Sequence, residues 1–106
     1  MGLYVYLDDE RETPLWFDRR VYTVEEAINL IETEDVEFIS LDNDLGLGLK
    51  EGYKVADYLE EKYFLTGKFI GFHPHTANPN AFERIMTAKR KVYLDYQKKG
   101  GTRECP

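Results

Sequence analysis

The chain has 106 residues, of which 42% are apolar and 14% aromatic, so it can form one packed core and is not disordered. Its net charge of -6 argues against general DNA or RNA binding, which depends on neutralising phosphates, but it allows a nucleotide-sized ligand. We expect one cytoplasmic domain over residues 1–106, because no apolar run approaches the ~20 residues of a membrane span, no signal pattern opens the chain, and the single cysteine, Cys105, permits no internal disulfide.

The first expected element is a strand over residues 3–7, which is rich in β-branched and aromatic side chains. We expect it to be the central strand of a sheet, followed by a loop over residues 8–14. Residues 16–22 alternate weakly in polarity and predict a short edge strand. Its aromatic side chains are expected to pack in the core or at the sheet edge: Trp16, Phe17 and Tyr22.

A helix is predicted to begin after Thr23, because Thr23 and Glu26 have the spacing of a capping box. Apolar residues then follow at helical spacing and should face the core: Val24, Ala27, Ile28 and Ile31. The apolar run over residues 36–41 predicts a buried strand.

A glycine-rich segment over residues 46–49 follows this strand. It lacks the lysine of a phosphate-binding P-loop, so we expect a flexible rim against which a base could pack. Apolar spacing over residues 55–63 predicts a second helix, which Gly67 should end.

The last third of the chain predicts a strand over residues 69–72 and then a long helix from Pro79 or Asn80. Basic side chains in the second half of that helix are expected to be solvated: Lys89, Arg90 and Lys91. Strands that alternate with helices predict an α/β fold. We expect a three-layer α/β/α sandwich with a short, mainly parallel sheet of about four strands.

Carboxylates follow two of the predicted strands: Asp8 and Asp9 after the first, Asp42 and Asp44 after the strand over residues 36–41. Ligand sites in open α/β sheets lie outside the carboxyl ends of the strands. A cluster of like charges there is unfavourable unless a cation or shared protons compensate. Because oxygen-rich sites suit magnesium or manganese, the pattern indicates a divalent-metal site.

Other polar residues lie in or beside the same loops. His75 is a candidate acid–base residue, because imidazole titrates near neutral pH, and it shares one face with His73 if the strand continues. Arg11 follows the acidic pair and could bind a phosphate bidentately. Asn78 precedes Pro79 and is either a turn or cap residue or a ligand group.

The order of these motifs resembles a response-regulator receiver domain over roughly residues 3–78. The resemblance implies a flavodoxin-like fold in which Asp8 and Asp9 bind a metal, Asp42 is the phosphoacceptor and Thr76 supplies a hydroxyl. A further receiver feature is a glycine, Gly52, ten residues after the aspartate.

A family of cyclic-phosphate-processing receiver domains is a closer resemblance, carried by residues 7–11, 40–46, 52–53 and 75–79 together with Pro14 and Met86. Asn43 stands where that family commonly has histidine, and Thr76 where it commonly has serine. The last receiver strand and its phosphate-binding lysine are missing after the long helix. This difference disfavours phosphorelay signalling and favours chemistry at the same site.

The resemblance therefore implies a phosphoesterase that processes a cyclic nucleotide or a 2′,3′-cyclic phosphate end of RNA. In this interpretation Mg²⁺ or Mn²⁺ is held by Asp8, Asp9 and Asp42. The catalytic residues are His75, Asp42 and Asp44, and the substrate-binding residues are Arg11, Thr76 and Asn78. The alternative is a non-catalytic module that binds or sequesters a phosphorylated ligand or docks on a protein partner. The sequence leaves the oligomeric state open.

Overall fold

The computed structural model describes residues 2–44 and 51–101. In chain order the elements are β1 (Leu3–Leu7), β2 (Arg19–Val21), α1 (Val24–Thr33), β3 (Val36–Leu41), α2 (Tyr53–Thr66), β4 (Gly71–Pro74) and α3 (Pro79–Lys98). The glycine-rich rim predicted at residues 46–49 lies outside the described residues. Among the described helices, none is long and apolar enough to cross a membrane.

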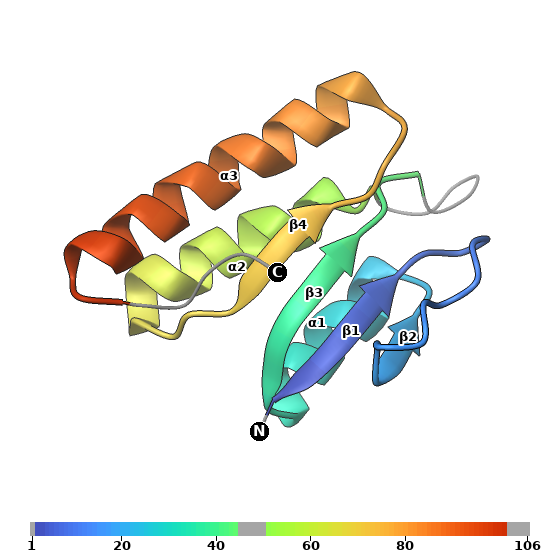
Figure 1. Ribbon diagram of the computed structural model, residues 1–106, viewed down its shortest axis with the longest axis horizontal. Coiled ribbons are helices and arrows are strands. Elements are labelled where there is room, and N and C mark those ends of the chain that lie inside the picture. The colour runs from blue at the N-terminus through green and yellow to red at the C-terminus, as the bar shows by residue number, and fades with distance from the viewer. Residues whose placement is uncertain (1, 45–50, 102–106) are drawn as a thin grey trace.

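The four strands form one parallel sheet in the order β2-β1-β3-β4, with β1 in the interior as predicted (Figure 1). The register aligns the carboxyl ends of the three neighbouring strands β1, β3 and β4, because Leu7 is the partner of Leu41 and Leu41 the partner of Pro74. The residues that follow these strand ends therefore lie side by side at one edge of the sheet.

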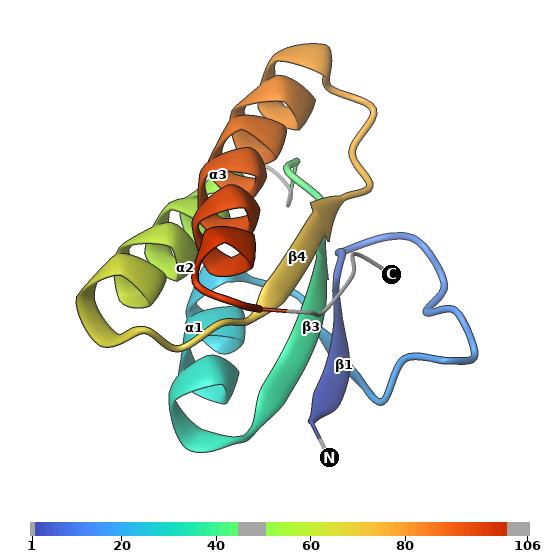
Figure 2. The same cartoon turned by 60° about the vertical axis from the view of Figure 1, so that its left-hand side comes forward.

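All three helices lie on one face of the sheet (Figure 2). The crossovers from β2 to β3 and from β3 to β4 advance in the same direction across the sheet, so right-handed connections place their helices on the same side. Strand residues that face the helices form the core with them, among them Val5, Leu7, Ile39, Leu41 and Phe72.

The receiver-like α/β class is confirmed, but in the described residues the arrangement has two layers, where the sequence predicted three. The connection from β1 to β2, over residues 8–18, passes on the opposite side of the sheet from the helices (Figure 2). It supplies a loop to that face in place of a second helical layer.

Local signals set the element ends largely as predicted. Thr23 caps α1 by accepting a hydrogen bond from the Glu26 N–H (3.1 Å), and Gly67 ends α2 in the left-handed conformation, with φ of 78°. The predicted strand over residues 69–72 is observed two residues later, as β4.

The structure narrows one prediction about side chains and contradicts another. Trp16 is 73% exposed and Tyr22 is also exposed, so of the two places expected for them, the core is excluded and the sheet edge remains. The prediction of a solvated side chain was wrong for Lys89, which is only 8% exposed, because it lies on the buried face of α3 and its Nζ reaches Nδ1 of His73 (2.7 Å).

Candidate functional site

Three residues that directly follow strands converge at the edge of the sheet. Asp8 follows β1, Asp42 follows β3 and His75 follows β4, and each backbone N–H continues the strand ladder by donating to the neighbouring strand. One ligand atom from each side chain lies within 4.8 Å of the other two. The aligned strand ends thus bring together three of the residues singled out from the sequence.

Asp8 is the most completely bonded member of this cluster, at 1% exposure. Its Oδ1 accepts from the backbone N–H groups of Glu10 (2.8 Å) and Arg11 (2.9 Å). Its Oδ2 accepts from Arg11 Nη1 (3.0 Å) and from His75 Nε2 (2.9 Å). Burial raises the pKa of Asp8, but these hydrogen bonds outweigh it and hold the pKa below its usual value. Asp8 is therefore a carboxylate fixed in its charged form.

His75 connects Asp8 to a serine that the sequence analysis did not assign to the site. The hydroxyl of Ser40 lies 2.6 Å from Nδ1 of His75, and the imidazole stacks on Tyr6 with a centroid distance of 4.4 Å. These hydrogen-bond partners indicate that the imidazole is neutral, with its Nε2–H donating to Asp8 and its Nδ1 accepting from Ser40. Burial lowers the pKa of His75, although the hydrogen bond that the ring donates to Asp8 opposes this shift. Ser40 lies on β3 beside β4, and its small polar side chain within an apolar run was the signal that could have identified it.

Asp42 has the opposite electrostatic setting. It is buried, and its Oδ1 accepts from the Asn43 N–H (2.9 Å). Burial and then the carboxylate of Asp8 raise the pKa of Asp42. Among the described residues, no hydrogen bond reaches its Oδ2. The paired carboxylates are therefore inequivalent, with the charge more firmly held on Asp8.

Arg11 supplies the positive charge of the cluster. Its Nη1 donates to Asp8, donates to the carbonyl oxygen of His75 (3.2 Å) and lies 3.6 Å from Oδ1 of Asp42. The side chain is still 48% exposed. Arg20 donates to the carbonyl oxygen of Arg11 and so supports the loop that carries it. Arg11 thus reaches over the acidic cluster, where the sequence placed it.

The remaining predicted site residues do not join the cluster of ligand atoms. Asp9 is half-buried and Asp44 is exposed, and in the described part of the chain neither belongs to the potential metal-binding group. Thr76 accepts from the Asn78 N–H (3.1 Å). Asn78 caps α3 by accepting from the N–H groups of Asn80 and Ala81. Of the two roles open for Asn78, the structure shows the cap.

Asn43 is fully buried at 0% exposure. Its Oδ1 accepts from the Tyr53 N–H (3.1 Å), and its Nδ2 donates to Asp44 (3.2 Å) and Glu51 (3.0 Å). Asn43 therefore ties the end of β3 to the start of α2. Gly52 is part of the same junction, since a Cβ there would lie 1.7 Å from the carbonyl oxygen of Asp42.

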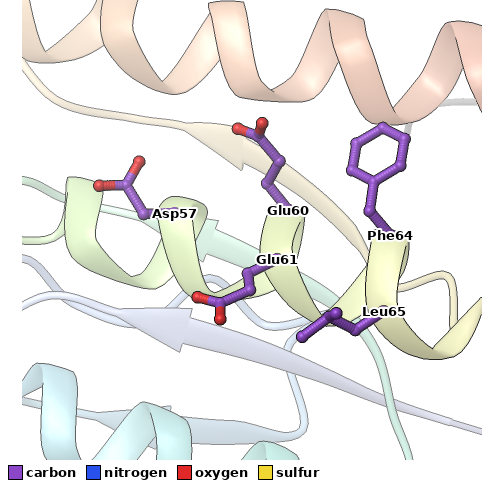
Figure 3. A pocket seen from close by; sticks show the side chains of 5 residues that line it. All are labelled: Asp57, Glu60, Glu61, Phe64 and Leu65. Carbon is purple, nitrogen blue, oxygen red and sulfur yellow. The ribbon is translucent and has the colours of Figure 1, made fainter.

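Two cavities differ in their relation to this site. A hollow of about 450 Å³ on the outer side of α2 is lined by residues of that helix alone: Asp57, Glu60, Glu61, Phe64 and Leu65. Figure 3 shows that Asp57 and Glu60 point to one side and Glu61 to the other, so its carboxylates do not converge. A cavity of about 370 Å³ on the face without helices instead includes Ser40 and His75 in its lining.

A family model described as a cyclic-phosphate processing receiver domain matches residues 3–91. No curated protein and no solved structure matches the chain. The matched range includes all four strands and the whole cluster of Asp8, Arg11, Asp42 and His75.

Proposed function

Because the chain belongs to the cyclic-phosphate processing receiver family, we propose that it is a phosphoesterase that opens a cyclic phosphate on a nucleotide or at a 2′,3′-cyclic end of RNA. The observation that carries this proposal is the hydrogen-bonded series Asp8–His75–Ser40 beside the guanidinium of Arg11. It combines an oriented acid–base group with a phosphate-binding cation.

The reaction needs one proton taken up and one delivered. A water oxygen forms a bond to phosphorus, one ring P–O bond breaks, and the leaving alkoxide receives a proton, which gives a phosphate monoester and a free hydroxyl. Asp8 holds the Nε2–H of His75, which leaves Nδ1 as the basic nitrogen. Because Nδ1 accepts from the Ser40 hydroxyl, Ser40 passes its proton to Nδ1 and takes the proton of the water, and Asp8 stabilises the imidazolium that forms. The same imidazolium then returns the proton to the leaving oxygen. The lowered pKa of His75 keeps the ring in its basic form at neutral pH.

Arg11 is the proposed phosphate clamp. Its Nη1 is held by Asp8 and by the backbone of His75, while nearly half of the side chain remains exposed. The planar guanidinium carries further N–H groups that match two oxygens of a phosphate. Thr76 and the amide nitrogen of Asn78 are proposed as further substrate contacts from the neighbouring loop.

A divalent cation fits the donor set of the cluster in type and charge. Asp8 and Asp42 present carboxylates, Asp42 has a raised pKa that nearby positive charge would relieve, and Arg11 balances only part of the negative charge. We propose that Asp8 and Asp42, with Asp9 beside them, would hold Mg²⁺ or Mn²⁺, and that Asp44, in the loop after β3, would help to complete the site. Such an ion supplies Lewis-acid polarisation of phosphoryl oxygens and a lowered pKa for bound water.

The test is product identification with a panel of 2′,3′- and 3′,5′-cyclic nucleotides and cyclic-phosphate-ended oligonucleotides, with and without Mg²⁺ or Mn²⁺. We expect a monoester product whose rate of formation falls roughly 10²- to 10⁴-fold in both His75→Ala and His75→Gln. Glu61→Gln, an exposed change on α2, is the matched control and should keep full activity. Unchanged substrate across the whole panel, with a folded protein, would contradict the enzymatic proposal.

One observation favours the alternative of a binding module. Both oxygens of Asp8 and both ring nitrogens of His75 already have hydrogen-bond partners within the protein, as expected of side chains whose role is to hold the site in shape for a ligand. In that case calorimetry would detect binding of a phosphorylated ligand that depends on Arg11, while no product forms.

A further inference from the structure

The face of the sheet without helices carries a cavity of about 370 Å³ lined mainly by aromatic rings. Tyr4 and Tyr6 of β1 and Phe38 of β3 alternate with residues that face the core, so their rings point away from the helices. The connection from β1 to β2 adds Trp16 and Phe17. Phe17 lies at the centre of this group, with centroid distances of 5.1 Å to Tyr6, 6.1 Å to Trp16 and 6.4 Å to Phe38.

We propose that this cavity binds the purine or pyrimidine base of the substrate, and this inference rests on the proposed function. His75 lines the cavity and also donates to Asp8. The imidazole of His75 bonds the Ser40 hydroxyl, in the cavity lining, through Nδ1 and the Asp8 carboxylate through Nε2. The cavity and the acidic cluster are therefore one imidazole ring apart. In a nucleotide a single ribose separates base and phosphate, so one molecule can occupy both places.

The lining also specifies the chemistry of the occupant. Of the described residues, none that lines the cavity carries a carboxylate, guanidinium or ammonium group. A second phosphate or a charged peptide would therefore find no counter-charge in its walls. A neutral, flat ring system gains stacking on the aromatic faces of the lining. The volume lies in the range of small-molecule sites.

Trp16 provides both the probe and the perturbation. It is the one tryptophan of the sequence, it lines the cavity, and its 73% exposure means that Trp16→Ala removes little buried packing. Adenosine or cytidine, which carry no phosphate, should quench the fluorescence of the wild-type protein saturably. A cyclic phosphate without a base, such as glycerol 1,2-cyclic phosphate, should not quench it. The neighbouring Leu15, at 99% exposure, supplies the matched control Leu15→Ala.

Turnover gives the second readout. Trp16→Ala should lower kcat/KM roughly 5- to 150-fold for nucleoside 2′,3′-cyclic phosphates, which is the range expected for one stacked base, and should leave the base-free cyclic phosphate unaffected. Comparing a mononucleotide with an oligonucleotide that ends in the same cyclic phosphate then distinguishes a free nucleotide from an RNA end as the source of the base.

The inference and the proposed function fail in different ways. Asp42→Asn, which lies outside the cavity lining, should abolish turnover and keep nucleoside quenching. If nucleosides do not quench Trp16 saturably, or if Trp16→Ala affects base-bearing and base-free substrates equally, the base cavity is refuted even though cyclic phosphates are hydrolysed. If quenching occurs but no cyclic phosphate is processed, the base cavity stands and the enzymatic proposal fails.

Discussion

The substitution Asp42→Asn is expected to stabilise the protein at neutral pH. Burial and the neighbouring carboxylate of Asp8 raise the pKa of Asp42, so its charged form is less favourable in the folded chain than in the unfolded chain. Asparagine keeps the oxygen that accepts from the Asn43 N–H and removes the charge. The change therefore separates the electrostatic cost of the site from its hydrogen bonding.

The distances set the size of the effect. Ligand atoms of Asp8 and Asp42 lie no more than 4.8 Å apart, where two unit charges repel by about 3.5 kcal/mol at an effective dielectric constant of ~20. Arg11 offsets much of this, since its Nη1 lies 3.6 Å from Asp42, but solvent screens its half-exposed side chain. We expect a net gain of about 1 kcal/mol, which is an increase in Tm of roughly 4–8 °C for a domain of this size.

The stabilisation by Asp42→Asn should depend on pH. In the wild type, Asp42 is protonated and costs no stability below its unfolded pKa of about 3.9. The free energy of unfolding then decreases as pH rises through the higher folded pKa and the carboxylate becomes charged. The advantage of Asp42→Asn should therefore be near zero at the acid end and largest at pH 7. Thermal or urea unfolding from pH 4 to 8, with Glu61→Gln as control, measures it. A variant that is less stable than wild type at pH 7, or a difference independent of pH, would refute the reasoning.

Four further predictions concern the same site. Mg²⁺ or Mn²⁺ should raise the Tm of the wild type through binding to the native state; an equal rise in Asp42→Asn would rule out the metal site. A small phosphodonor should leave Asp42 unmodified by intact-mass measurement, because Arg11 is the one cation paired with it among the described residues and is already held by Asp8; a stable added phosphate would favour signalling. His75→Ala should lower kcat roughly 10²- to 10⁴-fold with metal-dependent melting intact, whereas Arg11→Ala should also raise KM; full activity of His75→Ala would make the imidazole structural. Gly52→Ala should destabilise the fold by at least roughly 1–3 kcal/mol in urea unfolding, because its Cβ would overlap the backbone of Asp42; an unchanged midpoint would show that this junction adapts.

The placement of the site could be predicted from the sequence because it depends on topology alone. Parallel strands end at the same edge, so acidic residues after two apolar runs and a histidine after a third had to meet there. The hydrogen-bond partners of the individual side chains could not be predicted from the order of the strands. Asn78 and Asp44 have the right residue types, yet Asn78 caps α3 and Asp44 pairs with the amide of Asn43.

The number of layers could not be predicted because both faces of β1 are apolar. Val5 and Leu7 face the helices, while Tyr4 and Tyr6 face the other side, and a strand with two apolar faces is typical of a sheet covered on both sides. The burial of Lys89 could not be predicted from the sequence either. Its position among basic residues predicts a solvated side chain, but the helix turns it toward His73.

Because all the described helices lie on one face of the sheet, the acidic cluster and the aromatic cavity can share one side chain, His75. Right-handed crossovers place α1, α2 and α3 on the core face, so the side chain of His75, on the other face, stacks on Tyr6 without a helix above it. One edge of the imidazole then meets Asp8 and the other meets Ser40 at the aromatic cavity. A second helical layer over this face would cover the aromatic side chains and close the cavity. The absence of that layer in the described chain therefore leaves the proposed acid–base residue, His75, at the wall of the proposed base cavity.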